Sequence, residues 1–116
     1  MAGPSLSLLV LKTDQLAAMC SFYESLGLEF DEEQHGDGPV HYSATFSGLT
    51  LEIYPLIKGT PDTTTRLGFR VPDLGSILNR LATTAPSVNA PKQTEWGLRT
   101  VVKDPDGRSV ELYQGG

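Results

Sequence analysis

The stretch that decides the fold closes the chain. It runs from Glu95-Trp96-Gly97-Leu98-Arg99 through the turn Asp104-Pro105-Asp106-Gly107 to Val110-Glu111-Leu112-Tyr113. Its last part repeats an earlier segment, Leu51-Glu52-Ile53-Tyr54. Because strand side chains alternate with a period of two, each copy puts a carboxylate and a phenol on one face. The repeat predicts two copies of one unit whose polar faces line a cavity.

The spacing of the two copies supports a duplication. Glu52 and Glu111 lie 59 positions apart, and the tyrosines two places further on repeat the same interval. Leu16 and Leu74, the first apolar residues after two aspartate-containing turns, lie 58 positions apart. The two halves therefore agree in order and spacing to within a residue.

Composition limits the classes of protein that fit. A chain of 116 residues suits one domain, and a net charge of −5 disfavours nucleic acid while mildly favouring cationic ligands. The single cysteine, Cys20, allows no intrachain disulfide and is expected to pack as a small hydrophobe. No apolar run approaches the roughly 20 residues of a membrane span. We expect a soluble, cytoplasmic protein without nucleic-acid or membrane partners.

The first half reads as strand, helix and three strands. The pattern predicts a buried strand over 6–12, a helix over 15–26 that ends at Gly27, and strands over 28–33, 40–46 and 49–54 joined by turn residues. The apolar positions of the helix recur at spacings of three and four: Leu16, Met19, Cys20, Tyr23 and Leu26.

The second half repeats that order. A strand over 66–71 precedes Asp73, which is expected to cap a helix whose interior is weakened at Gly75 by about 1 kcal/mol. Strands follow over 88–93, 98–103 and 108–113. The sequence therefore predicts an α+β fold of two tandem βαβββ units in a single domain, 1–116. Unit one covers about 5–56, a linker about 57–63, and unit two about 64–114. The apolar stripe of the helix expected after Asp73 comprises Leu74, Ile77, Leu78 and Leu81.

Two motifs carry a family resemblance. Phe22-Tyr23-Glu24-Ser25-Leu26-Gly27-Leu28 resembles the first-helix signature of the vicinal oxygen chelate superfamily, and the stretch from Trp96 to Leu112 resembles its closing hairpin. This superfamily includes glyoxalase I, extradiol dioxygenases, and bleomycin and fosfomycin resistance proteins. The resemblance implies a curved mixed sheet. It also implies, in metal-dependent members, a divalent ion held by the first and last strands of each unit.

Carried over by spacing, the four metal-ligand positions fall on Leu8, Glu52, Arg66 and Glu111. Leucine has no lone pair to donate, and a guanidinium does not deprotonate at usable pH. We therefore expect no metal and no other cofactor at this site. Two readings of the remaining groups stay open. Arg66 neutralises one or both carboxylates as a structural ion pair, or the three form the polar floor of a ligand cavity. In the cavity, Glu52 or Glu111 binds an amine or hydroxyl, or acts as a base.

Aromatic and histidine side chains supply the other candidates. Trp96 stacks on a planar ligand or anchors a core or an interface, and Tyr54 and Tyr113 hydrogen-bond a ligand or complete the polar network. His41 opens a strand and is a candidate acid or base. His35 lies in an acidic turn, and its spacing from His41 argues against a shared metal site.

These residues favour a ligand-binding homodimer. We expect a metal-independent protein, closest in character to bleomycin-resistance-like members, that binds a small organic ligand in a cup between two chains. Its expected ligand-binding residues are Glu52, Tyr54, Arg66, Trp96, Glu111 and Tyr113. The alternative is a metal-dependent lyase, isomerase, transferase or dioxygenase-type enzyme using Glu52 and Glu111. A third hypothesis is an association module whose cup is filled by its own side chains. The sequence leaves open whether any reaction is catalysed, and it does not identify the ligand.

Overall fold

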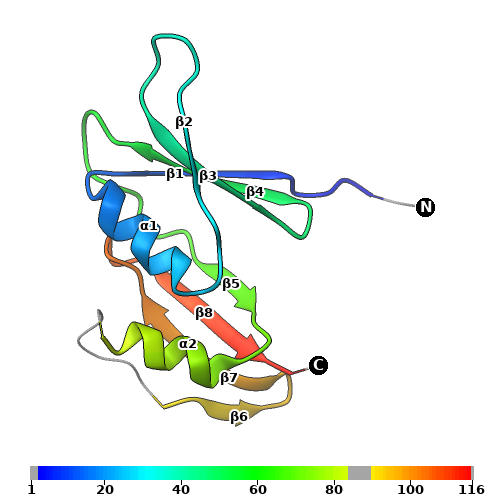
Figure 1. The fold of residues 1–116 in the computed structure, drawn as a ribbon. Coiled ribbons are helices and arrows are strands. Elements are labelled where there is room, and N and C mark those ends of the chain that lie inside the picture. Colours follow the sequence, from blue (N-terminus) through cyan, green and yellow to red (C-terminus); the bar gives the residue numbers. More distant parts are fainter. Residues whose placement is uncertain (1–2, 84–89, 116) are drawn as a thin grey trace.

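A computed structural model describes residues 3–83 and 90–115. Its first half contains β1 (Leu8–Thr13), α1 (Leu16–Glu24), β2 (Asp31–Glu33), β3 (His41–Phe46) and β4 (Leu49–Pro55). Its second half contains β5 (Leu67–Arg70), α2 (Leu74–Leu81), β6 (Lys92–Thr94), β7 (Gly97–Lys103) and β8 (Ser109–Gln114). The two tandem βαβββ units predicted from the sequence are confirmed (Figure 1).

Each unit forms a four-stranded mixed sheet of the same topology. The strand orders are β1-β4-β3-β2 and β5-β8-β7-β6. In each sheet the first strand of the unit pairs in parallel with the last, and the other pairs are antiparallel. This equivalence confirms the duplication that the Glu-x-Tyr repeat indicated.

Local sequence signals explain most element ends. Gly27 has a φ of 109° after α1, and the Asp73 side chain accepts a hydrogen bond from the Ser76 amide at 3.2 Å at the start of α2. The strand expected over 28–33 is shorter than predicted, because only Asp31–Glu33 pairs with β3. The strand expected over 88–93 lies partly outside the described residues, where β6 begins at Lys92. Among the described helices, neither is long and apolar enough to cross a membrane.

The two units share one hydrophobic core. α1 contacts β4, α2 contacts β8, and Figure 1 shows α1 between the two sheets in that view. Burial raises the pKa of Cys20 to about 11, in agreement with its expected role as a packed side chain. The buried core draws on both helices and both sheets: Leu11, Met19, Cys20, Phe22, Tyr23, Leu26, Leu51, Ile53, Val71, Leu74, Ile77, Leu81, Val102, Val110 and Leu112.

The opposite faces of the sheets do not join this core. Because side chains alternate along β4, Glu52 and Tyr54 lie on the face turned away from buried Leu51 and Ile53. The same alternation along β8 sets Glu111 and Tyr113 opposite buried Val110 and Leu112. We call these the first open face (β1-β4-β3-β2) and the second open face (β5-β8-β7-β6).

A buried polar joint connects the units at the turn after β7. Asp104 is 4% exposed and accepts hydrogen bonds from the Tyr23 hydroxyl of α1 at 2.8 Å and from Arg108 Nη1 at 2.7 Å. Burial, followed by the Asp104 carboxylate, raises the pKa of Tyr23 well above its usual range. The neighbouring Asp106 accepts from the Thr13 hydroxyl at 2.9 Å. The turn over 104–107 therefore also links the two halves.

Candidate functional site

The strand register shows which residues lie directly beside the two repeated carboxylates. Glu52 on β4 lies beside Val10 of β1, whereas Leu8 lies beside Thr50. Leu8 and Val10 are two residues apart and so share one face of β1, and neither side chain can donate a lone pair.

The second unit has the equivalent arrangement. Glu111 on β8 lies beside Gly68 of β5, and Arg66 precedes that strand. A Cβ built on Gly68 would lie 4.0 Å from Glu111 Oε2, so a side chain there would point toward the carboxylate. Neither Gly68 nor its equivalent Val10 carries a donor atom. The residues directly beside the two carboxylates on β1 and β5 therefore offer no metal ligand.

Arg66 pairs with only one of its two candidate partners. Its Nη2 lies 2.9 Å from Glu111 Oε1, and Arg99 Nη2 binds the same oxygen. No ion pair or hydrogen bond joins Arg66 to Glu52 in the described ranges 3–83 and 90–115. Glu52 instead lies 3.8 Å from the Nε2 atom of His41. The two carboxylates thus occupy different environments on different sheets.

The second open face contains a cavity of about 500 Å³. Arg70 lies over the Tyr113 ring at 4.9 Å from its centroid and donates a hydrogen bond to the Gly115 carbonyl at 2.7 Å. Trp96 is 66% exposed and so is not the core anchor that the sequence left open. The cavity is lined by Arg70, Trp96, Arg99, Glu111 and Tyr113. Of these five residues, the sequence analysis named Trp96, Glu111 and Tyr113 as site residues.

Arg70 and Arg99 were not predicted from the sequence as site residues. Both lie directly beside Tyr113, Arg70 across the parallel pair with β8 and Arg99 across the antiparallel pair with β7. Alternation from Arg66 along β5 could have indicated Arg70. Nothing in the sequence indicated the register that brings Arg99 to Glu111.

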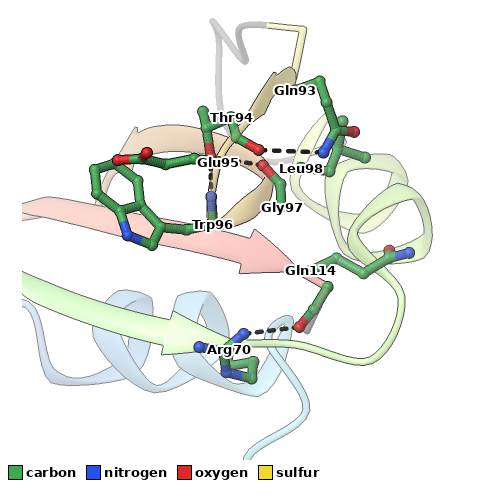
Figure 2. Close-up of a pocket in the computed structure, with 9 residues that line it drawn as sticks. Arg70, Gln93, Thr94, Glu95, Trp96, Gly97, Leu98 and Gln114 are labelled. Carbon is green, nitrogen blue, oxygen red and sulfur yellow. Dashed lines mark hydrogen bonds between the residues drawn. The ribbon is translucent and has the colours of Figure 1, made fainter.

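A tight turn holds Trp96 at the rim of the cavity. The Trp96 amide donates to Thr94 Oγ1 at 3.2 Å, and that hydroxyl donates to the Gly97 carbonyl at 2.7 Å. Gly97 has a φ of 114°, and a Cβ there would overlap the Gln114 carbonyl oxygen. Figure 2 shows this turn with the Trp96 ring extending from it and Arg70 at the end of β5. A hollow of about 870 Å³ lies along the same turn.

The first open face brings two histidines together. His41 is 1% exposed, and its ring stacks on Tyr54 with a centroid distance of 4.0 Å. The centroid of the His35 ring lies 5.0 Å from that of the His41 ring, although the sequence spacing argued against a shared metal site. The reason is that the β2–β3 connection folds back on the strand, with the Gly38 amide donating to the His35 carbonyl at 3.0 Å. Desolvation, then Glu52 and Glu33, raise the pKa of Tyr54.

The two open faces differ in charge. By strand register the first carries the acidic residues Asp31, Glu33 and Glu52 with one lysine, Lys12. The second sets Glu111 among three arginines and two lysines: Arg66, Arg70, Arg99, Lys92 and Lys103. The chain therefore has a basic cavity although its overall charge is −5.

Comparison with known proteins defines the class. The family model described as the Glyoxalase/Bleomycin resistance protein/Dioxygenase superfamily matches residues 5–112. The chain belongs to this superfamily, which is the vicinal oxygen chelate group that its motifs resemble. No curated protein matches the sequence.

Solved structures share the fold over almost the full length. TnmS3, an antibiotic binding protein from Streptomyces sp. CB03234, is 24% identical with a TM-score of 0.74, covering 100% of this chain and 99% of that one. A glyoxylase/bleomycin resistance protein/dioxygenase domain from Frankia sp. EAN1pec is 20% identical with a TM-score of 0.75 and coverages of 99% and 100%. A lactoylglutathione lyase from Agrobacterium tumefaciens is 17% identical with a TM-score of 0.67 and coverages of 99% and 96%. At these identities the likeness concerns the fold alone.

Proposed function

We propose that this protein binds a small organic molecule without a metal ion at the superfamily's ligand positions. The observation that carries the proposal is the cavity of about 500 Å³ on the second open face, which joins an exposed tryptophan to paired charged groups. Val10 and Gly68, the side-by-side companions of Glu52 and Glu111, offer no donor atom to a metal. Binding and orientation, rather than Lewis-acid activation, are what these residues supply.

The lining chemistry favours a planar ligand with an anionic or acidic group. Trp96 and Tyr113 offer aromatic faces, and Arg70 and Arg99 offer guanidinium groups that pair with carboxylates or phenolates. Glu111, already paired with Arg66 and Arg99, accepts a hydrogen bond from a hydroxyl of the same ligand. The description of the similarly folded TnmS3 as an antibiotic binding protein agrees with a small organic ligand.

The cup is completed by a second copy of the chain. Within one chain the two open faces belong to different sheets, one acidic and one basic. In a two-fold dimer, the first open face of one protomer covers the second open face of its partner, and charges of opposite sign then meet. Glu52 and Tyr54 thereby join Arg66, Trp96, Glu111 and Tyr113 around one ligand.

A binding experiment with matched charge variants tests the proposal. A panel of planar aromatic acids and polycyclic antibiotics is screened by quenching of Trp96 fluorescence and by calorimetry. Arg99→Met is expected to weaken binding of an anionic hit by about 1.5–3 kcal/mol, as the loss of a charged hydrogen bond. The control, Lys103→Met, removes the same charge from the same face of β7 outside the cavity and should leave affinity unchanged.

Two results would overturn the proposal. Equal loss of affinity in Arg99→Met and Lys103→Met would mean that binding depends on general charge and not on the cavity. A stoichiometric metal that is lost in Glu111→Gln would favour the metal-dependent alternative.

A further inference from the structure

The β2–β3 hairpin gathers potential metal ligands that the proposed cup does not use. One donor atom each from Glu33, His35 and His41 lies within 4.8 Å of the other two. Figure 1 shows the connection between β2 and β3 extending beyond the sheet, away from the second unit. The cluster is thus separate from the cavity near Trp96.

The buried His41 ring has an unsatisfied nitrogen. Its Nδ1 lies 3.2 Å from the Pro39 carbonyl, which can only accept, so Nδ1 carries the proton and Nε2 presents a lone pair. Nε2 is buried and has no hydrogen-bond partner. It lies 3.4 Å from Glu33 Oε1 and 3.8 Å from Glu52 Oε2. A lone pair facing two carboxylates is electrostatically unfavourable unless a cation lies between them.

A divalent metal ion accounts for this arrangement better than a proton does. A proton on Nε2 would pair the ring with Glu33 and Glu52 but would give His35 no role. A 2+ ion uses both imidazoles and balances the charges of Glu33 and Glu52. The His41 Nδ1 contact with a backbone carbonyl is also the outer-shell bond that commonly orients a metal-binding imidazole.

We propose that Glu33, His35 and His41 bind one divalent transition-metal ion, with zinc the best match, and that Glu52 is a charge-balancing neighbour. Two imidazole nitrogens and one carboxylate oxygen are a zinc ligand set, with bonds of about 2.0–2.2 Å and one coordination position left open. The exposed His35 side chain closes the remaining distance, while its carbonyl stays fixed by the Gly38 amide. The ion clamps the short β2 strand and its loop to β3.

The three proposed metal ligands are not residues of the proposed ligand cup, although their neighbours Glu52 and Tyr54 are. The superfamily positions carried over from spacing lie on the first and last strands of each unit, whereas all three proposed ligands lie on β2, β3 and the loop between them. Metal binding here should therefore be insensitive to Glu111.

The test is a metal titration of tag-free protein from which metal has been removed by a chelator. Zinc alone is added in calorimetry and cobalt alone in visible spectroscopy. We expect one ion per chain with micromolar or tighter affinity, a higher melting temperature with zinc, and the visible absorption of low-coordinate cobalt. Glu33→Gln and His35→Ala should each weaken affinity by more than the roughly 10–100-fold typical of losing an outer-shell partner.

Two control variants distinguish binding at this site from non-specific attraction of the metal ion to acidic residues. Asp37→Asn removes a charge from the same loop without touching the cluster, and Glu111→Gln removes one from the other sheet; both should keep wild-type affinity. The inference fails if wild-type protein binds no zinc at micromolar concentration, or if His35→Ala binds as tightly as wild type. It also fails if Asp37→Asn loses as much affinity as His35→Ala. Because both cluster variants change side chains that are not fully buried, metal-free melting curves can verify that they fold.

Discussion

Single residues show how far chain position and spatial role can diverge. Tyr23 belongs to a helix stripe that the sequence identifies as core, and its ring is fully buried. Its hydroxyl nevertheless extends to the other half of the molecule, where it donates to Asp104. Arg108, 1% exposed, completes the joint by binding the same carboxylate and the Asp62 carbonyl. A buried charge pair of this kind depends on both partners, so the joint is sensitive to single changes.

Tyr23→Phe tests the joint and gives it a pH dependence. The hydroxyl bond is worth about 1–2 kcal/mol of unfolding free energy. Because the folded-state pKa of Tyr23 lies above the unfolded value of about 10, its contribution is complete below pH 10 and is lost as pH rises further. Urea unfolding from pH 7 to 11 should show a shallower alkaline decline in Tyr23→Phe than in wild type.

A tyrosine without that contact is the control. The Tyr113 hydroxyl makes no hydrogen bond within the described residues, so Tyr113→Phe should keep the alkaline slope of the wild-type protein. Identical slopes for wild type and Tyr23→Phe would show that the Tyr23–Asp104 bond does not stabilise the folded state.

At the scale of elements, similar residues have opposite effects in different surroundings. Gly75 lies in the first turn of α2, and a Cβ there would make an ordinary contact, 3.6 Å from Asp73 Oδ1. Gly97 starts β7 with a left-handed φ and a close approach to β8 that leaves no room for a side chain. One glycine is therefore a removable weakness, whereas the other is required by the hairpin that positions Trp96.

Alanine at these two positions should change stability in opposite directions. Gly75→Ala is expected to raise the unfolding free energy by about 0.5–1 kcal/mol, since alanine restricts the unfolded chain and favours helix. Gly97→Ala should lower it by at least about 2 kcal/mol, because backbone strain and overlap add. Chemical denaturation measures both. Equal stability of Gly97→Ala and wild type would contradict the described β7–β8 geometry.

The whole molecule is more open than its length requires. Its radius of gyration is 14.9 Å, compared with about 13.4 Å expected for a compact chain of this size. The extra extent reflects two sheets that share a core on one side and leave the other side uncovered. Apolar side chains are exposed along β1 and just before it, including Leu8 at 51% and Val10 at 39%. An exposed apolar strand at a sheet edge is suited to burial against another chain.

Val10→Asp tests the proposed dimer. A carboxylate on the already acidic first open face should move protein from dimer to monomer in sedimentation at micromolar concentration and remove any rise of melting temperature with concentration. Ile57→Asp makes the same change at an apolar side chain that is 89% exposed and outside both sheets, and it should remain dimeric. A monomeric wild type would rule out a cup shared between chains.

The fold was largely predictable and the site only partly so. Helix stripes, the Asp73 cap and Gly27 are local signals, and they correctly predicted the order and type of the elements. Strand register is not local, so spacing alone did not show that Val10 and Gly68 lie directly beside Glu52 and Glu111. The role of Arg99 and the proximity of His35 to His41 were not predicted for the same reason, because both depend on which residues meet across strands and loops.

The sequence by itself determined the duplicated βαβββ architecture and the absence of donor side chains at the first-strand positions. Both follow from hydrophobic periodicity and residue chemistry, which are written along the chain. The tertiary structure alone decided that Glu111 is held by Arg66 and Arg99, that Glu52 lies beside a buried histidine, and that the open faces differ in charge. These features arise because pairing and burial join residues that are distant in sequence, and the energy of a charge depends on the groups brought next to it.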